Sequence, residues 1–214
     1  STKLYRLTKT YNASHTVMHC SFTHFLEYYM SNTFLVGSKT ILRPVELSDA
    51  PTLTRWMNDP VTRLYLTRRL PLTELNEKSF IEKISTLSVA PSSIVLIIED
   101  KECRKPVGVM GLHDIHWITR KAVTGTVIGE ESYRGKGYAT DAKMILLKYA
   151  FEDLGLHKIT SHAFAANQKS IDYSKRCGYK VEAILRDEIF HEGTWVDMVS
   201  LACFYDDWKE VSRN

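Results

Sequence analysis

The chain has 214 residues, of which 44% are hydrophobic and 25% are charged, and its formal net charge is +3 at pH 7. This size and composition are typical of one globular domain with an ordinary hydrophobic core, so disulfides or metals are not needed to hold it together. The small net charge argues against nucleic acid as the main partner. No stretch reaches the ~18 consecutive apolar residues of a membrane span, so we expect no membrane partner.

Cysteine usage points to a reducing compartment. Cys20, Cys103, Cys177 and Cys203 are scattered, and no Cys-X-X-Cys pair occurs. Scattered free thiols are typical of cytoplasmic proteins. The first residues carry no signal-peptide pattern. We therefore expect a cytoplasmic protein.

The beginning of the chain differs from the rest. Residues 1–29 are rich in Ser, Thr, His and Tyr and show no clear period. We therefore divide the chain into an N-terminal extension of unclear role, residues 1–39, and one domain, residues 40–214.

Four potential metal ligands cluster in the extension: His15, His19, Cys20 and His24. His15 and His19 would share one face of a helix, and such a set could bind a transition metal. The alternative is chance clustering in a polar arm. Because the usual zinc spacings are absent, we expect no metal.

Apolar patterns and capping residues predict the elements of the domain in chain order. The predicted strands are 40–44, 94–98, 107–117, 122–129, 158–164, 180–185 and 194–204, and the last strand pair is predicted to turn at His191-Glu192-Gly193. The predicted helices are 49–57, 73–87, about 138–154 and 168–176. About seven strands and about four helices indicate an α/β domain built around a central sheet.

One segment, Arg134-Gly-Lys-Gly-Tyr-Ala139, has the features of a phosphate site. It joins a predicted strand to a predicted helix. Two glycines permit a sharp turn and a close approach to a ligand. The helix start offers unpaired N–H groups and partial positive charge, and Arg134 and Lys136 add full charges. Neither the P-loop pattern nor the complete dinucleotide fingerprint is present.

Two further motifs follow at defined distances. They are Asn167-Gln-Lys-Ser170 and Gly178-Tyr179, one strand and one helix after the loop. Together the order and spacing resemble the GNAT N-acetyltransferases, over roughly residues 40–208. The last segment, with Glu182, Arg186, Gly193-Thr-Trp-Val-Asp197, Tyr205 and Trp208, resembles the RimJ/RimL-like branch, which acetylates protein N-termini and other amines.

The resemblance implies a fold and a co-substrate. The sheet would be mixed and mostly antiparallel, with a V-shaped splay in which acetyl-CoA lies. The residues that would cradle its pyrophosphate are Arg134, Gly135, Lys136, Gly137, Tyr138 and Ala139. The backbone of Val127 and Ile128 would pair with the pantetheine arm, and Asn167 would contact that arm or orient the acceptor. Asn167 is also a suitable cap for the helix that starts at Gln168.

The family mechanism is direct transfer in a ternary complex. A backbone N–H near Ile128 is suited to stabilise the oxyanion. Many relatives protonate the thiolate with a tyrosine seven residues after the asparagine, where this chain has Ser174. Ser170 resembles a serine that some RimL-like enzymes are thought to use, and Tyr173 is one residue away. We take Ser170 as the candidate acid.

For the general base we take Glu188, with Glu130, Asp114 and His116 as alternatives that no spacing decides. His113 and His116 lie three apart on a predicted strand, so at most one faces the cleft. An acetyl-cysteine intermediate on Cys177 is the rival route. Nothing nearby in sequence would lower the pKa of that thiol, so we favour a packing role.

The amine acceptor stays open in the sequence. A protein N-terminus, a polyamine, an amino sugar and an aminoglycoside are all primary amines that this chemistry would suit. A non-catalytic acyl-CoA-binding module on the same fold is the alternative function. Families of this kind often dimerise, so a homodimer is also expected as a possible assembly.

Overall fold

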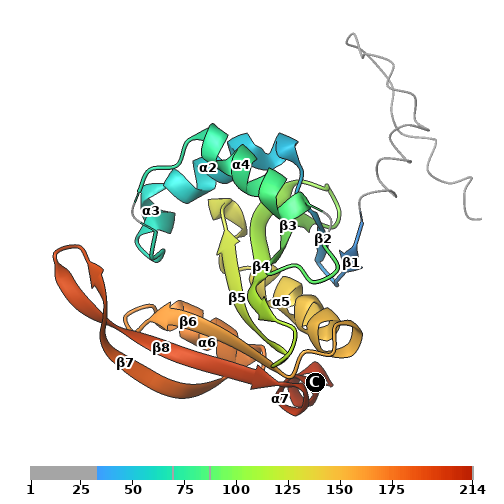
Figure 1. Ribbon diagram of the computed structural model, residues 1–214, viewed down its shortest axis with the longest axis vertical. Helices are drawn as coiled ribbons and strands as arrows, with labels where there is room; N and C mark the ends of the chain where they lie inside the picture. Colours follow the sequence, from blue (N-terminus) through green and yellow to red (C-terminus); the bar gives the residue numbers. More distant parts are fainter. Residues whose placement is uncertain (1–32, 69, 87, 214) are drawn as a thin grey trace, which may run out of the picture. The chain divides into compact units, whose positions relative to one another are not determined.

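The computed structural model describes residues 33–68, 70–86 and 88–213, which belong to one compact unit (Figure 1). Its strands are β1 (Leu35–Val36), β2 (Thr40–Pro44), β3 (Ile94–Asp100), β4 (Pro106–His116), β5 (Lys121–Ile128), β6 (Lys158–Phe164), β7 (Lys180–His191) and β8 (Thr194–Phe204). Its α-helices are α2 (Ala50–Asn58), α3 (Pro60–Arg63), α4 (Glu74–Ser85), α5 (Tyr138–Lys148), α6 (Gln168–Arg176) and α7 (Tyr205–Ser212).

The strands form one mixed sheet in the order β1-β2-β3-β4-β5-β6-β8-β7. All neighbours are antiparallel except β5 and β6, which are parallel. The predicted α/β class with a mostly antiparallel sheet is confirmed. No described helix combines the length and apolarity that a membrane crossing needs.

Both faces of the central part of the sheet are covered. Strand β3 is a continuous apolar run, which is expected of a strand buried on both sides. Its alternate residues Leu96 and Ile98 join a core under α5, α6 and α7, whereas Val95 and Ile97 join a second core under α2 and α4. Figure 1 shows α2 and α4 together on one side of β3 and β4, and α5 on the other. We refer to these as the α2/α4 face and the α5/α6 face.

The sheet opens between its two parallel strands. The register of β5 with β6 runs only from Lys121↔Lys158 to Val123↔Thr160. Strand β5 continues to Ile128, paired with β4 alone. Beyond Val123 the edge of β5 that faces β6 therefore has no strand partner, which is the predicted V-shaped splay.

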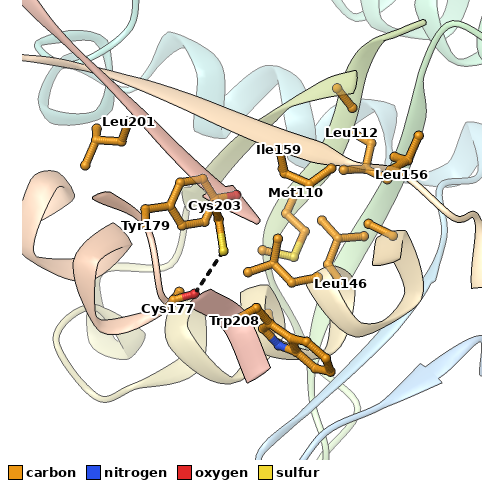
Figure 2. Packing of buried hydrophobic residues seen from close by; sticks show 14 of the residues in the cluster. Met110, Leu112, Leu146, Leu156, Ile159, Cys177, Tyr179, Leu201, Cys203 and Trp208 are labelled. Atoms are coloured by element: carbon orange, nitrogen blue, oxygen red, sulfur yellow. Dashed lines mark hydrogen bonds between the residues drawn. The ribbon is translucent and has the colours of Figure 1, made fainter. Parts of the chain in front are cut away.

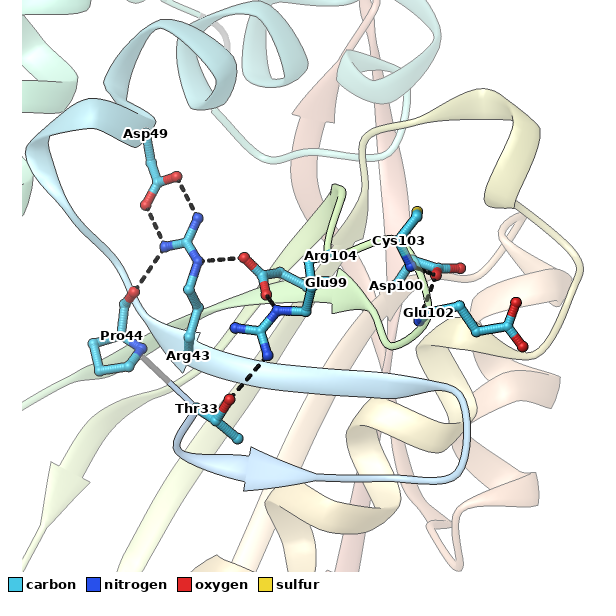
Figure 3. A network of polar contacts seen from close by, with 9 residues as sticks. All are labelled: Thr33, Arg43, Pro44, Asp49, Glu99, Asp100, Glu102, Cys103 and Arg104. Carbon is cyan, nitrogen blue, oxygen red and sulfur yellow. Dashed lines mark hydrogen bonds and ion pairs between the residues drawn. The ribbon is translucent and has the colours of Figure 1, made fainter. Parts of the chain in front are cut away.

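A buried ion network ties the first half of the sheet to α2 (Figure 3). The Arg43 guanidinium donates to both oxygens of Asp49, at 2.8 and 2.7 Å, and its Nε donates to Glu99 at 2.6 Å. Arg104 forms a second ion pair with Glu99, at 2.7 Å. Asp49 immediately precedes α2, so the network fixes where that helix leaves the sheet.

Several boundaries differ from the predictions. Strand β1 lies inside the segment assigned to the extension, and it pairs with β2, so the compact unit begins at Thr33 rather than at residue 40. Helices α3 and α7 were not predicted, and β7 extends to His191 instead of 185. A bulge between Leu185 and Ile189 breaks the alternation of β7, which hides its second half from pattern analysis.

Replacing Arg43 tests how much the buried network contributes to stability. Arg43→Met leaves the Asp49 carboxylate buried without its cation, and we expect a loss of about 3–5 kcal/mol in the free energy of unfolding. Urea denaturation followed by circular dichroism measures it. Lys78→Met removes the exposed pair with Glu74 and should change stability by less than ~1 kcal/mol. Equal effects of the two variants would contradict the assignment.

Candidate active site

The loop between β5 and α5 has the geometry of an anion site. Gly135 and Gly137 have φ values of +72° and +88°, which disfavour residues with a Cβ. Both glycines and Lys136 are exposed. Helix α5 begins directly after the loop, so its first N–H groups and partial positive charge point to the same place. The loop therefore presents backbone donors on an open surface.

A second lysine reaches this loop from a distant part of the chain. Lys39 Nζ donates to the Lys136 carbonyl at 3.2 Å. Asp141, in the first turn of α5, holds the turn before β2 in place by accepting hydrogen bonds from Ser38, Lys39 and Thr40. Burial alone would raise the pKa of Asp141, but these hydrogen bonds outweigh it and lower the pKa. Sequence analysis missed Lys39, because nothing local links it to the loop.

The Arg134 side chain has a different position from the one that the motif suggests. Its Nε donates to the carbonyl of Ile128 at 3.0 Å, and its Nη2 is 3.2 Å from both the Gly129 carbonyl and the Thr62 hydroxyl. The guanidinium thus clamps the end of β5 to α3. It leaves the helix start to the backbone, Lys39 and Lys136.

Helix α2 packs closely on the end of β5. A Cβ at Gly129 would come within 2.1 Å of the Trp56 ring, so only glycine fits there. The Glu130 carboxylate accepts from Arg55, Trp56 and Lys105. These donors lower the pKa of Glu130 to about 2. A carboxylate held in this way is a poor base, which counts against Glu130 as the alternative general base.

Beside β5, the splay is lined by hydroxyl groups on the α5/α6 face. Tyr173, from α6, donates to Thr126 Oγ1 at 3.1 Å. The hydroxyls of Tyr179 and Thr124 lie 2.9 Å apart in a buried hydrogen bond. Lys143 Nζ lies over both rings, 4.4 Å from the centroid of Tyr173 and 4.7 Å from that of Tyr179. Two tyrosines therefore link α6 and the following turn to the unpaired segment of β5.

Lys143 is a buried cation that the sequence pattern did not reveal. Its side chain is 1% exposed, and burial lowers its pKa to about 8. Lys143 lies between Ala142 and Met144 on α5. The helical spacing of the apolar residues gave no reason to expect a charged side chain in the core at this position. No ion pair with a carboxylate is present for it in the described part of the chain.

The motif residues on α6 have clear local roles. Asn167 caps the helix by accepting from the Ser170 N–H at 3.2 Å, as expected for the capping interpretation. The Ser170 side chain is half-buried. Ser174, at the position where many relatives have tyrosine, is 1% exposed and packs in the core. Tyr173, one residue earlier, is the side chain that reaches β5.

The remaining candidates lie apart from this arrangement. Glu188 is exposed in the bulged part of β7. Asp114 is exposed with a φ of +49°, and the Nδ1 of His116 accepts from the Thr119 N–H at 3.1 Å. The described residues include no group of His, Cys, Asp or Glu that could hold a metal, and the cluster His15, His19, Cys20 and His24 lies outside them.

The buried cysteines belong to the core. Cys203 Sγ lies 3.8 Å from the Cys177 carbonyl oxygen, among residues of the core under α5 (Figure 2). Burial raises the pKa of the Cys177 thiol to about 11 and that of Cys203 to about 12. A protonated, buried thiol is not a nucleophile, so the packing role predicted for Cys177 fits better than an acetyl-cysteine route.

Comparison with known proteins identifies the family. The model of the acetyltransferase (GNAT) domain matches residues 39–180, which is most of the described unit. The chain belongs to the GNAT acetyltransferase family. It is an acetyl-CoA-dependent acetyltransferase.

Individual relatives agree with this family. An uncharacterized N-acetyltransferase, p20 of Bacillus licheniformis, is 28% identical over 77% of this chain and 92% of its own length. The spermidine N(1)-acetyltransferase of Vibrio cholerae is 32% identical over 48% of this chain and 58% of its own length. A crystal structure of spermidine N-acetyltransferase from Vibrio cholerae with CoA and spermine has a TM-score of 0.74 at 23% identity. It covers 80% of this chain and 99% of that one.

The residues present in this GNAT domain fit a CoA molecule. A Cβ built at Gly135 meets nothing within 4 Å, so the loop leaves open space beside its backbone. Lys39 and Lys136 are exposed cations beside that space, and the edge of β5 is free from Thr124 onward. A pyrophosphate at the loop and an amide-bearing arm along β5 would satisfy both features.

Gly137→Asp tests the phosphate role of the loop. The carboxylate would stand against the phosphates, and we expect CoA affinity to fall about tenfold or more, measured by calorimetry. Gly193→Asp is the matched control, since Gly193 has a similar φ of +83° in the β7–β8 turn. Unchanged affinity in Gly137→Asp would contradict the assigned loop.

Lys143→Met tests the buried cation. The pKa of Lys143 is about 8 in the folded protein, below the ordinary 10.5. The free-energy cost of burying the charged ammonium is therefore fully present below pH 8. It decreases as pH rises from 8 to 10.5 and is absent above that range. Methionine has a similar shape and no charge. At pH 7 we expect the variant to gain up to ~3 kcal/mol in unfolding free energy, and to lose the wild-type rise in stability between pH 8 and 10.5. Denaturant titrations across that range measure both.

Proposed function

We propose that this chain transfers the acetyl group of acetyl-CoA directly to a primary amine, within a complex that holds both substrates. The observation that carries the proposal is the unpaired edge of β5, which runs from the splay to the phosphate loop. One extended ligand bound along this edge reaches the loop with its anionic end. Its reactive end lies where β5 and β6 separate.

We assign the binding of acetyl-CoA to these two features. Of the loop residues Arg134, Gly135, Lys136, Gly137, Tyr138 and Ala139, the last five form the pyrophosphate site, mostly through backbone N–H groups, while Arg134 holds the end of β5 beside it. Lys39 adds charge. The backbone of Val127 and Ile128 pairs with the pantetheine arm, and Asn167, at the start of α6, contacts that arm or orients the acceptor in addition to capping the helix.

Bound acetyl-CoA supplies the activated acyl group, and the protein supplies donors around it. A backbone N–H near Ile128 stabilises negative charge on the carbonyl oxygen. The Arg134 clamp on the carbonyls of Ile128 and Gly129 holds this segment of backbone in a fixed orientation. Acetyl transfer then requires a group that accepts the amine proton and one that protonates the thiolate, and no metal.

Two hydroxyls are candidates for protonating the thiolate: Ser170 and Tyr173. Burial raises the pKa of Tyr173 well above its usual value, so its hydroxyl keeps its proton at neutral pH. Its hydrogen bond to Thr126 holds it at the unpaired segment of β5. We favour Tyr173 because of this position, with Ser170 as the second candidate and Glu188 as the base expected from sequence.

The relatives point to one class of amine as the first candidate acceptor. Proteins named spermidine N(1)-acetyltransferase are among them. The closing segment resembles the RimJ/RimL-like branch, which makes a protein N-terminal α-amine the other leading candidate. A cytoplasmic location is part of the proposal, supported by the free thiols of Cys103, Cys177 and Cys203. We also propose that the protein forms a homodimer.

Thiol release from acetyl-CoA tests the function. The assay uses spermidine, an N-terminal peptide, an amino sugar and an aminoglycoside, with product mass as confirmation. We expect turnover with at least one of them. Tight CoA binding without turnover on any amine would contradict the proposal and favour a non-catalytic acyl-CoA-binding module.

Tyr173→Phe and Ser170→Ala separate the two proton donors. Removing the true acid should lower kcat by about 10²–10³, with little change in CoA affinity. We expect this loss in Tyr173→Phe and a much smaller one in Ser170→Ala. The reverse order would assign the role to Ser170, and unimpaired kcat in both variants would exclude an essential side-chain acid at these positions.

A further inference from the structure

The side chain of His113 has an unusual position on the sheet. His113 is the last residue of β4 before the bulge and lies opposite Val123. Its imidazole extends over Gly111 and Gly125, which face each other on β4 and β5. A Cβ at Gly111 would stand 3.1 Å from its Nε2, and one at Gly125 would stand 3.4 Å away. Because the two neighbouring glycines have no side chains, they leave space on the sheet surface that the imidazole occupies.

This position of the imidazole is next to the splay. Gly125 is the second residue of β5 after its pairing with β6 ends. On β4 and β5, Gly111 and Gly125 share a face with Val109 and Val127, which pack against the core under α2 and α4. Thr124 and Thr126 point the other way, to the tyrosines. His113 and Tyr173 therefore approach the same unpaired segment of β5 from opposite faces of the sheet.

The imidazole is in the form that a base needs. His113 is half-buried, and no hydrogen bond engages its ring nitrogens in the part of the chain that the structure describes. Burial lowers the pKa of His113, and Asp114, the charged group that acts on it, offsets this only in part. At neutral pH the ring is mostly uncharged and has an unused lone pair.

The other candidate bases lack this combination. Glu130 is neutralised by Arg55 and Lys105, and Glu188 is exposed on β7. Asp114 is exposed, and His116 already accepts a backbone hydrogen bond. Among these groups, only His113 joins partial burial and a free acceptor atom to a position beside the unpaired strand.

We propose that His113 is the general base that deprotonates the acceptor amine, on the α2/α4 face of the splay. The proposal rests on the function proposed above. The ammonium gives its proton to an imidazole nitrogen, and the freed lone pair forms the new N–C bond at the acetyl carbonyl. The C–S bond then breaks, and the thiolate takes a proton from the hydroxyl donor on the α5/α6 face. The nitrogen still carries one proton more than an amide has, and it releases that proton, which through solvent replaces the one that the donor gave up. The imidazolium returns the first proton to solvent.

The pH dependence follows in sign. The base works only when neutral, and its folded pKa lies below 6.5, so kcat/KM should be lost as pH falls through that lower value. His113→Gln should lower kcat by about 10²–10³ at neutral pH and abolish this acid limb, while CoA affinity stays within about twofold. In the variant, acceptor amines of lower pKa should lose less activity than amines of higher pKa. A larger fraction of their molecules is already uncharged at the assay pH and needs no base.

His116→Gln is the matched control, since it removes a histidine of the same strand. We expect it to retain the wild-type rate and acid limb. If His113→Gln does not fold, His113→Ala leaves space over the two glycines, and added imidazole should restore part of the rate. The imidazole protons of His113, followed by NMR, should titrate below pH 6.5 in the wild type and be missing in either variant.

The outcomes separate this assignment from the proposed function. Turnover by the wild type, together with an unchanged rate and acid limb in His113→Gln, would overturn the role of His113 alone. A titration above pH 6.5 would also overturn it. No turnover by the wild type with any amine would overturn the proposed function and this role together.

Discussion

The early separation of β5 from β6 is the constraint on which the rest of the site depends. Three registered residue pairs join these parallel strands, and then β5 continues beside β4 alone. Unpaired backbone N–H and C=O groups are strong hydrogen-bonding groups that need a partner. An extended ligand with amide groups is such a partner. The opening is therefore an unsatisfied edge of the sheet, and it is the surface that we propose binds CoA.

Side chains on both faces keep the opening in place without closing it. On the α5/α6 face, Tyr173 and Tyr179 bond to Thr126 and Thr124, which satisfies side-chain groups and leaves the backbone edge free. On the α2/α4 face, the pair of glycines beneath His113 removes side chains from the sheet surface. The buried charge of Lys143 on the α5/α6 face opposes folding, because burial disfavours its charged form.

The phosphate loop depends on contacts made far away in sequence. Asp141 of α5 holds the turn that carries Lys39, and Arg134 holds the end of β5 instead of pointing to the helix start. The buried Arg43 network fixes the departure of α2, whose Trp56 packs on Gly129. These contacts set the distance between the loop and the splay, so the two halves of a bound CoA molecule would be fitted by separate parts of the chain.

The sequence by itself determined the order of the main strands and helices, the glycine loop, the Asn167 cap and the family resemblance, because periodicity, capping and short motifs are local. It did not reveal β1 or α3, which are too short for a pattern, nor the second half of β7, whose bulge breaks the alternation. Only the tertiary structure brought Lys39 to the loop, since 97 residues separate it from its partner. Only the structure placed Tyr173 and His113 on opposite faces of β5 and buried Lys143. These positions follow from strand pairing and helix packing, which bring together residues that no local spacing connects.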